Sequence, residues 1–130
     1  MIVLDASAAL EYAMGTPRSP WIGERLATAA TLHMPELLAL EVVSAVRRLA
    51  RHRQITIERA ALTVRNVVDI RGVRHGHDLL APRVLDLSGR LSPYDAVYVA
   101  LAEALGAPLL TLDGRLARGA ADLVEVELVS

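Results

Sequence analysis

Two short apolar runs, one near each end of the chain, both stop at an aspartate. Residues 1–4 are followed by Asp5, and residues 108–112 are followed by Asp113. Runs of this length indicate buried strands, and helix-forming residues come after both aspartates. Buried strands that lead directly into helices are typical of α/β domains with a mainly parallel sheet. This pattern restricts the fold class more than any other feature of the sequence.

The helix predicted over residues 92–105 has the most complete signals in the chain. Ser92 is a good N-cap, Pro93 suits the first helical position, and Gly106 follows the last turn. Because this segment is apolar nearly all round, we expect it to be buried at the centre. The long helix over 35–52 is expected to hold Pro35 in its first turn. Further strands are predicted over 31–34, 73–75 and 123–129, and further helical segments over 6–11, 21–30, 56–70, about 81–87 and 115–119.

This alternation predicts one three-layer α/β/α domain over residues 1–130, since no repeat or linker interrupts it. The chain has no Cys and no Lys, so all 14 basic residues are arginine. These absences exclude a disulfide framework, a thiolate zinc site, a Schiff-base enzyme and a P-loop. No charge-free run reaches the ~18 residues of a membrane span, so we expect no membrane segment and a cytoplasmic location. The net charge of −1 gives no overall attraction for nucleic acid.

Four acids stand in apolar surroundings: Asp5, Glu41, Asp95 and Asp113. Burying a carboxylate without a partner is costly, so such positions are informative. Each has a structural explanation when it is taken alone. Asp5 and Asp113 can be helix N-caps, Asp95 can complete a capping box with Ser92, and Glu41 can lie at the edge of an apolar stripe.

The four acids are harder to explain structurally as a set. In an open parallel sheet the carboxyl ends of the strands share one edge, and ligands bind there. Asp5 and Asp113 follow such ends, and the helix starts share that edge, so we expect the carboxylates to converge. They would repel each other without a cation between them. Hard oxygen ligands with no His or Cys suit Mg²⁺ or Mn²⁺.

Each of the four acids lies in a distinct short segment. The segments are Val-Leu-Asp-Ala-Ser-Ala-Ala-Leu at 3–10, Pro-Glu-Leu-Leu-Ala-Leu-Glu-Val at 35–42, Ser-Pro-Tyr-Asp-Ala-Val-Tyr-Val-Ala-Leu-Ala at 92–102, and Leu-Thr-Leu-Asp-Gly-Arg-Leu at 110–116. In order and approximate spacing they resemble the acidic motifs of the PIN (PilT N-terminus) domain family, and the third segment is the most distinctive. The short single-domain form most resembles VapC, the toxin ribonuclease of prokaryotic VapBC toxin–antitoxin pairs.

The resemblance implies an Mg²⁺- or Mn²⁺-dependent endoribonuclease in which the four acids surround the metal and catalysis leaves a 5′-phosphate and a 3′-hydroxyl. Thr111 and Ser7 match hydroxyl positions that support the carboxylates. It also implies a homodimer that is neutralised by a VapB-type antitoxin, with tRNA or rRNA as substrate. Arg115 and Arg118, just after the fourth acid, are placed to contact RNA.

Three other functions fit parts of the pattern. A housekeeping RNA-processing nuclease would keep the fold and the chemistry but have no toxin role. A catalytically silent PIN module would only bind a partner, although the complete set of four acids argues against it. A phosphatase of the haloacid dehalogenase type needs a second aspartate two residues after Asp5, where this chain has Ser7, and a lysine that it lacks.

A group of arginines lies where the helix over 35–52 ends. Arg47, Arg48, Arg51 and Arg53 gather there together with His52. They can bind phosphates, and such binding would weaken as salt increases. Alternatively, they form a solvated helix end whose cations suit the C-terminal dipole. The sequence favours neither reading.

Overall fold

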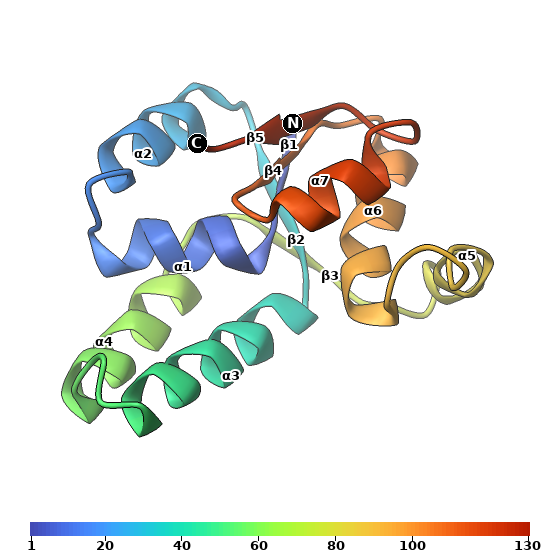
Figure 1. Cartoon of the computed structure of the whole chain (residues 1–130). Helices are drawn as coiled ribbons and strands as arrows, with labels where there is room; N and C mark the ends of the chain where they lie inside the picture. The colour runs from blue at the N-terminus through green and yellow to red at the C-terminus, as the bar shows by residue number, and fades with distance from the viewer.

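A computed structural model, which describes residues 1–130, has a five-stranded sheet at its centre (Figure 1). All the strand pairs are parallel, and their order across the sheet is β3-β2-β1-β4-β5. This confirms the predicted α/β class with a parallel sheet. The strands are β1 (Ile2–Leu4), β2 (Leu32–Pro35), β3 (Val73–His75), β4 (Leu109–Thr111) and β5 (Val126–Leu128).

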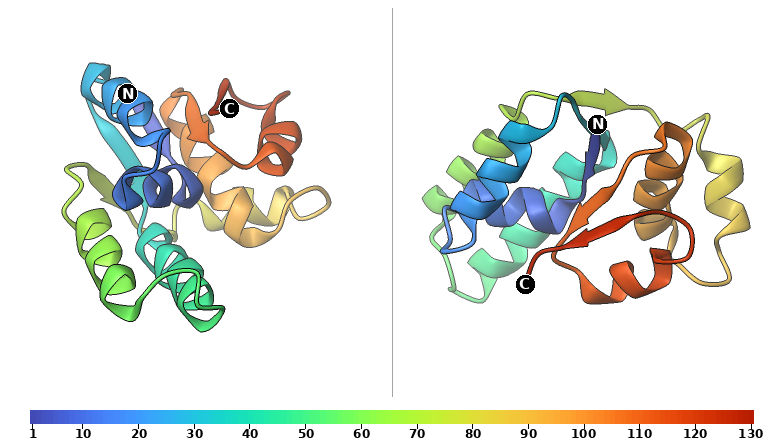
Figure 2. Two further views of the ribbon diagram at one scale, coloured as in Figure 1. Left: turned by 60° about the vertical axis from the view of Figure 1, so that its left-hand side comes forward. Right: turned by 90° about the horizontal axis from the view of Figure 1, so that it is seen from above.

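The helices form two layers, one on each face of the sheet. Helices α1 to α4 cover one face and α5 to α7 cover the other (Figures 1 and 2). The strand order explains this, because the chain moves outward from β1 to β3 and then returns to β4 on the far side of β1. Right-handed crossovers in opposite directions place their helices on opposite faces. The helices are α1 (Ala6–Met14), α2 (Ser19–Thr28), α3 (Leu37–Arg51), α4 (Ile57–Val68), α5 (Ala81–Asp86), α6 (Pro93–Leu105) and α7 (Gly114–Ala120).

Helix α6 lies at the centre, as its sequence predicts. Ser92 caps its start by accepting the backbone N–H of Asp95, and Gly106 ends it in the left-handed conformation at φ 61°. Seven consecutive residues, 96–102, are buried, and the helix packs against β1, β2 and β4. The α6 segment therefore supplies much of the core directly beneath the sheet.

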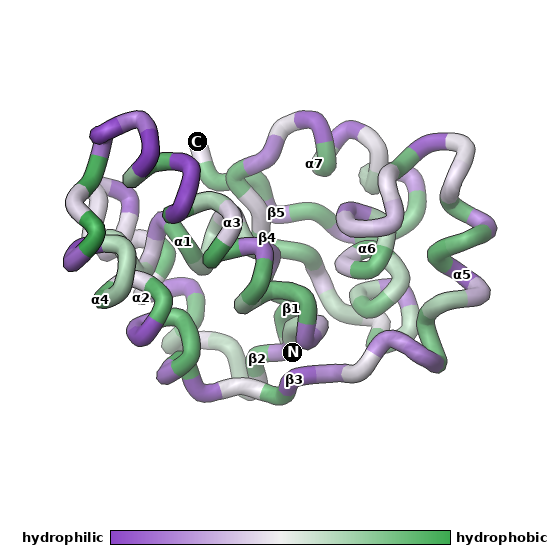
Figure 3. Tube along the Cα trace, turned by 90° about the horizontal axis from the view of Figure 1, so that it is seen from below, coloured by the Kyte–Doolittle hydropathy of each residue, from purple (hydrophilic) through white to green (hydrophobic).

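Burial across the sheet decreases from its centre to its edge. All three residues of β1 are fully buried, whereas Val73 in β3 is 47% exposed. Figure 3 shows the same trend, with hydrophobic residues along β1 and hydrophilic ones along β3. No helix combines the length and the apolar character needed to cross a membrane.

Several predicted element boundaries are wrong, among them the start of the last strand, which is Val126 instead of residue 123, and the end of the first helix, which is Met14 instead of residue 11. Pro35 is the last residue of β2 and pairs with His75, and α3 begins only at Leu37. Proline has a φ that suits a strand end as well as a helix start, and here the pairing of β2 with β3 decides between them. Helix α2 begins at Ser19 instead of residue 21, with Pro20 in its first turn. The turn expected over 115–119 is a helix of seven residues.

Candidate active site

The four predicted acids lie at the carboxyl edge of the sheet, where the direction of the strand connections reverses. Asp5 directly follows β1, and Asp113 comes two residues after the end of β4. These two strands are neighbours, but the chain leaves β1 towards β2 and leaves β4 towards β5. Such a switch point is where open α/β sheets bind ligands. Asp95 lies in the first turn of α6, and Glu41 in the second turn of α3.

Asp5 is the most firmly held of the four carboxylates and is only 4% exposed. Its Oδ1 accepts the backbone N–H of Ala8 at 2.9 Å and the hydroxyl of Ser7 at 2.7 Å, and its Oδ2 accepts the hydroxyl of Thr111 at 2.6 Å. A carboxylate has about four acceptor positions, so one on Oδ2 stays open. Asp5 is therefore a helix N-cap and still has an oxygen to offer to a ligand.

The hydroxyls of Ser7 and Thr111 connect the ends of β1 and β4. Besides donating to Asp5, Ser7 accepts the backbone N–H of Leu112 at 2.9 Å. Thr111 accepts the backbone N–H of Asp113, also at 2.9 Å. The two hydroxyls thus fix the Asp5 carboxylate relative to the chain segment that carries Asp113.

Asp113 caps the start of α7 with one of its two oxygens. Its Oδ1 accepts the backbone N–H groups of Arg115 at 2.9 Å and Leu116 at 3.2 Å. No hydrogen bond uses its Oδ2. As with Asp5, the structural role of Asp113 leaves one carboxylate oxygen open.

Glu41 is held by Tyr98, a residue to which the sequence pattern assigned no role. The phenol of Tyr98 donates to Oε1 of Glu41 at 2.5 Å, and the tyrosine side chain is almost wholly buried. Burial and the neighbouring Glu41 raise the pKa of Tyr98 far above its ordinary value, so the phenol remains a donor. One signal was available in the sequence, because Tyr98 comes three residues after Asp95 and so lies on the same face of α6.

Asp95 does not complete the capping box that its position suggested. Its backbone N–H reaches the hydroxyl of Ser92 at 3.2 Å. The reciprocal bond from the Ser92 N–H to the Asp95 carboxylate is absent, so the helix start does not require that carboxylate.

The four carboxylates influence one another electrostatically. Burial raises the pKa values of Asp5, Glu41 and Asp95 above their ordinary range. The negative charge of Asp113 adds to this increase for Asp5 and Asp95, and the charges of Asp95 and Asp5 add to it for Glu41. The structure therefore gathers the four acids into one region of excess negative charge.

Arg115 partly offsets that charge. It is exposed in the first turn of α7, and its guanidinium lowers the pKa of Asp95 while burial raises it. Arg118 is exposed near the end of the same short helix. Both arginines therefore lie on the helix that Asp113 caps, with Arg115 the nearer to the acids in its electrostatic effect.

The acidic cluster fits a hydrated divalent cation better than one enclosed by protein ligands. No three His, Asp or Glu side chains lie close enough together to hold a metal ion. Mg²⁺ usually keeps several waters and binds through one or two carboxylates. The open oxygens of Asp5, Glu41 and Asp113, all hard donors, are of the kind that this ion prefers.

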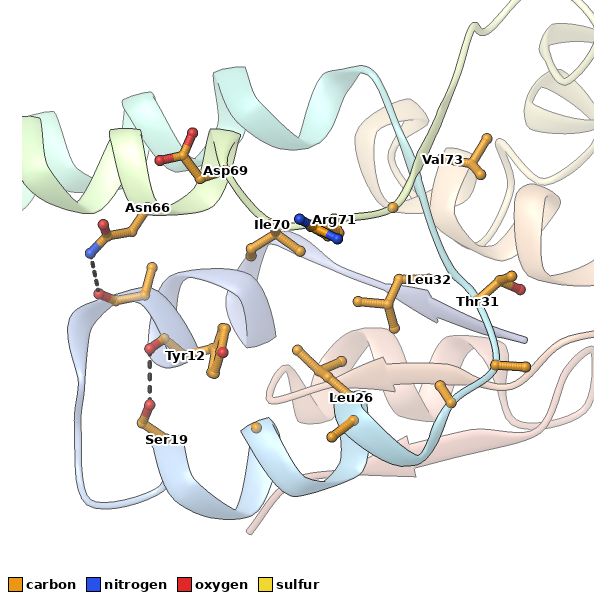
Figure 4. Close-up of a pocket in the computed structure, with 16 residues that line it drawn as sticks. Tyr12, Ser19, Leu26, Thr31, Leu32, Asn66, Asp69, Ile70, Arg71 and Val73 are labelled. Atoms are coloured by element: carbon orange, nitrogen blue, oxygen red, sulfur yellow. Dashed lines mark hydrogen bonds between the residues drawn. The ribbon is translucent and has the colours of Figure 1, made fainter.

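A large cavity lies at the opposite edge of the sheet. It has a volume of about 880 Å³ and lies among α1, α2, the end of α4 and the starts of β2 and β3 (Figure 4). Two of its polar side chains are bonded to nearby backbone: Ser19 donates to the carbonyl of Tyr12, and Asn66 donates to the carbonyl of Ala13. Asp69 is its only acidic lining residue, so this cavity contains no cluster of charges that resembles the carboxyl edge.

Comparison with known families agrees with the geometry of the acidic edge. The family model described as the PIN domain matches residues 2–122. The chain belongs to the PIN domain family. Among curated PIN relatives, Ribonuclease VapC12 of Mycobacterium tuberculosis is 37% identical over 130 residues, which is all of both chains. Ribonuclease VapC9 of the same organism is 40% identical over 119 residues, covering 89% of this chain and 88% of the relative.

Solved structures show the same PIN fold at lower sequence identity. The toxin VapC20 of Mycobacterium tuberculosis, described as cleaving the sarcin-ricin loop, superposes with a TM-score of 0.70 at 18% identity, covering 98% of this chain and 99% of that one. PAE2754 from Pyrobaculum aerophilum superposes with a TM-score of 0.69 at 23% identity, covering 95% and 82%. These likenesses establish the three-layer fold.

Proposed function

We propose that this PIN domain is a metal-dependent endoribonuclease that acts as the toxin of a VapBC-type pair, with Asp5, Glu41, Asp95 and Asp113 as its site. The observation that carries the proposal is the gathering of these four acids at the switch point of the sheet. Curated relatives that align over 89% to 100% of the chain are named ribonucleases, which supports the same activity.

The side chains have distinct tasks in the proposed reaction. A bound Mg²⁺ or Mn²⁺ would orient the scissile phosphate, activate the attacking water and offset charge on the leaving oxygen. Asp5 offers its open Oδ2 from a position fixed by Ser7 and Thr111. Glu41 has one oxygen engaged by Tyr98 and presents the other. Hydrolysis in this way leaves a 5′-phosphate and a 3′-hydroxyl.

A cleavage assay with purified protein tests the proposal. Labelled tRNA and rRNA fragments are incubated with the protein in Mg²⁺, in Mn²⁺ and in EDTA, and the wild type is compared with Asp95→Asn. We expect cleavage that needs the metal and disappears in the variant, because the asparagine removes a charge without changing the side chain's size. Metal-dependent cleavage that survives Asp95→Asn would remove this residue from the site. Cleavage that persists in EDTA would refute the metal chemistry.

The proposed toxin role has its own test. We propose that an antitoxin of the VapB type binds and silences this protein, and that the substrate is a structured tRNA or rRNA. Expression of the protein alone should then arrest growth, and co-expression of the product of an adjacent gene should restore it. Growth that continues in cells that contain cleavage-competent protein would instead favour a housekeeping RNA-processing role.

We also propose a homodimer, for which α3 and α4 provide apolar surface. Four of their large hydrophobic side chains are markedly exposed: Leu40 and Ile57 at 68%, Val68 at 56% and Leu62 at 47%. Single hydrophobic side chains on a surface are ordinary, but several on one helical hairpin favour an interface. Sedimentation at micromolar concentration should give the mass of a dimer, and a monomer mass would contradict it.

A further inference from the structure

Helix α3 connects the acidic site to the most basic part of the chain. Glu41 lies in its second turn, whereas its last turns and the following loop contain Arg47, Arg48, Arg51 and Arg53. No Asp or Glu occurs between Val42 and Ile57. One helix therefore has an acid near its start and a concentration of positive charge at its end.

These arginines have no partner within the protein. All four are exposed, and none forms an ion pair or a side-chain hydrogen bond. Some arginines elsewhere are paired, since Arg25 binds Glu127 at 2.6 Å and Arg83 binds Glu103 at 2.7 Å. The other unpaired arginines are spread over the rest of the chain, as Arg65, Arg71, Arg115 and Arg118. The charge at the end of α3 is thus uncompensated in a chain whose net charge is −1.

Helix geometry distinguishes Arg48 from its neighbours. At about 100° per residue, Arg48 lies within about 20° of the direction of Glu41, roughly 10.5 Å further along the axis. Arg51 is about 60° from Arg48 and lies roughly one turn beyond it. Arg47 is about 120° from Glu41 and about 100° from Arg48, and Arg51 lies between the two directions, about 40° from Arg47. The buried side of the helix, with Val42, faces the core.

The position of α3 in the molecule places Glu41 and Arg48 one after the other along a path that leads away from the acidic cluster. Figures 1 and 2 show α3 and α4 as a hairpin that extends away from the carboxyl edge of the sheet, with the start of α3 at that edge. A ligand that reaches the acidic cluster and continues along the Glu41 flank of α3 meets Arg48 next, and Arg51 lies further round the exposed side, about 80° from the direction of Glu41.

We propose that Arg48, assisted by Arg51, binds backbone phosphates of the RNA substrate on one side of the cleaved bond. This inference rests on the proposed ribonuclease function. Arginine presents a planar fork of donors that matches a phosphate. With a rise of ~3.4 Å per nucleotide of a stacked strand, Arg48 lies roughly three nucleotides from the acidic site. The occupant is a polyanion that extends from the acidic site, which describes RNA rather than an acidic protein segment.

A binding experiment with matched variants tests the proposal. In an Asp95→Asn background, which prevents cleavage, binding of a short fluorescein-labelled single-stranded RNA is followed by anisotropy in Mg²⁺ between about 50 and 200 mM salt. We compare Arg48→Gln, Arg51→Gln and Arg47→Gln. The last is the control, because it removes the same charge from an equally exposed position on the same helix.

We expect Arg48→Gln to weaken RNA binding roughly tenfold and to reduce the slope of log K against log salt by about 0.7, the value for one phosphate of a single strand. Arg51→Gln should have a smaller effect in the same direction. Arg47→Gln should change the affinity less than about twofold, as expected when a charge acts only through the general field. Thermal melts that match for all three variants confirm that each one folds.

Two results would overturn the proposal. Equal losses in all three variants would mean that the arginines act only as a diffuse positive field. If the slope of log K against log salt is unchanged in Arg48→Gln, then Arg48 contacts no RNA phosphate. That result would favour an acidic protein as the partner of these arginines. Failure of the proposed function is distinguishable, because in that case the wild type cleaves no RNA in metal. A wild type that cleaves RNA, together with an unchanged Arg48→Gln, contradicts this inference alone.

Discussion

The polar groups at the two edges of the sheet have opposite environments. At the amino edge, around the 880 Å³ cavity, Ser19 and Asn66 are satisfied by backbone carbonyls of the adjoining segment. At the carboxyl edge, burial, together with repulsion between the carboxylates, raises the pKa values of Asp5, Glu41 and Asp95. Glu41 and Asp113 there each keep a carboxylate oxygen that no hydrogen bond uses, and Asp5 keeps an open acceptor position on its Oδ2. The amino edge has the more voluminous cavity, but it has no cluster of acids. Raised pKa values in a cluster of carboxylates, which folding by itself does not require, support the carboxyl edge as the proposed active site.

Neutralising one acid at each edge gives the largest contrast. Asp113→Asn preserves the N-cap, because asparagine caps a helix as well as aspartate does, but it removes a charge from the cluster. We expect RNA cleavage to fall at least about 100-fold, at the upper end of what disturbing a metal site costs. The control, Asp69→Asn at the amino edge, should cleave at the wild-type rate. Equal losses in both variants would remove the distinction between the edges.

Removing one hydroxyl from α6 should have a smaller effect. Tyr98→Phe leaves Glu41 without its donor, so the carboxylate loses its fixed orientation. We expect Mn²⁺ affinity, measured by calorimetry, and cleavage to fall roughly tenfold. Tyr94→Phe is the matched control, since Tyr94 is on the same helix but 62% exposed. An unaltered Mn²⁺ affinity in Tyr98→Phe would show that the hydrogen bond only supports packing.

Crowding the backbone at the amino edge should lower the stability of the fold without changing metal binding at the carboxyl edge. A Cβ added at Gly72 would lie 2.8 Å from the end of Met34 and 3.0 Å from the carbonyl oxygen of Leu32. We expect Gly72→Ala to destabilise the fold by about 1–2 kcal/mol in chemical unfolding, with metal affinity unchanged. Gly76→Ala is the control, because nothing lies within 4 Å of its added Cβ. A stable Gly72→Ala variant would indicate that β2 shifts easily.

The smallest predicted effect is a gain in stability at the carboxyl edge. Because the pKa of Asp5 is raised on folding, the folded protein holds this proton more tightly than the unfolded chain does. The stability of metal-free wild type should therefore fall as pH rises from the ordinary carboxyl range through the raised value. Asp5→Asn removes that loss, and we expect its Tm at pH 7 in EDTA to be higher by about 4 °C, equivalent to ~1 kcal/mol.

Two comparisons sharpen this prediction. Asp122, whose pKa is lowered by its bond from Arg90, lies in the opposite situation, so Asp122→Asn should not gain stability at pH 7. Added Mg²⁺ should raise the Tm of the wild type and leave that of Asp5→Asn unchanged, because only an intact site gains from the ligand. A lower Tm for Asp5→Asn at pH 7 in EDTA would show that its hydrogen bonds outweigh its desolvation.

The sequence predicts most reliably what is set by neighbouring residues. Ser92 caps the start of α6, and Gly106 ends it in the left-handed conformation, as local patterns indicated. The placement of Asp5 and Asp113 after strands follows from the same local alternation. These features depend on a few adjacent residues, so distant packing does not alter them.

Features that depend on tertiary packing could not be predicted in this way. The bond from Tyr98 to Glu41 joins positions 57 residues apart and exists only because α3 and α6 meet at the same edge. Pro35 is compatible with both a strand and a helix start, and the backbone N–H of Glu36 donates to His75 on a different strand. Helix geometry alone gives the direction of Arg48 relative to Glu41. Whether Arg48 can contact RNA bound at the acidic site depends on where α3 begins, which tertiary packing decides.

The hydroxyl bridge between β1 and β4 has a consequence for how activity arises during synthesis. Thr111 meets Asp5 across 106 positions of sequence, and Asp113 follows only after that contact. A chain that stops before β4 lacks both residues and leaves β1 without a neighbour on one side. Contacts between such distant positions form late, since the intervening chain must first become ordered. We therefore expect nascent and truncated chains to lack the proposed site, which is complete only once β4 has joined β1.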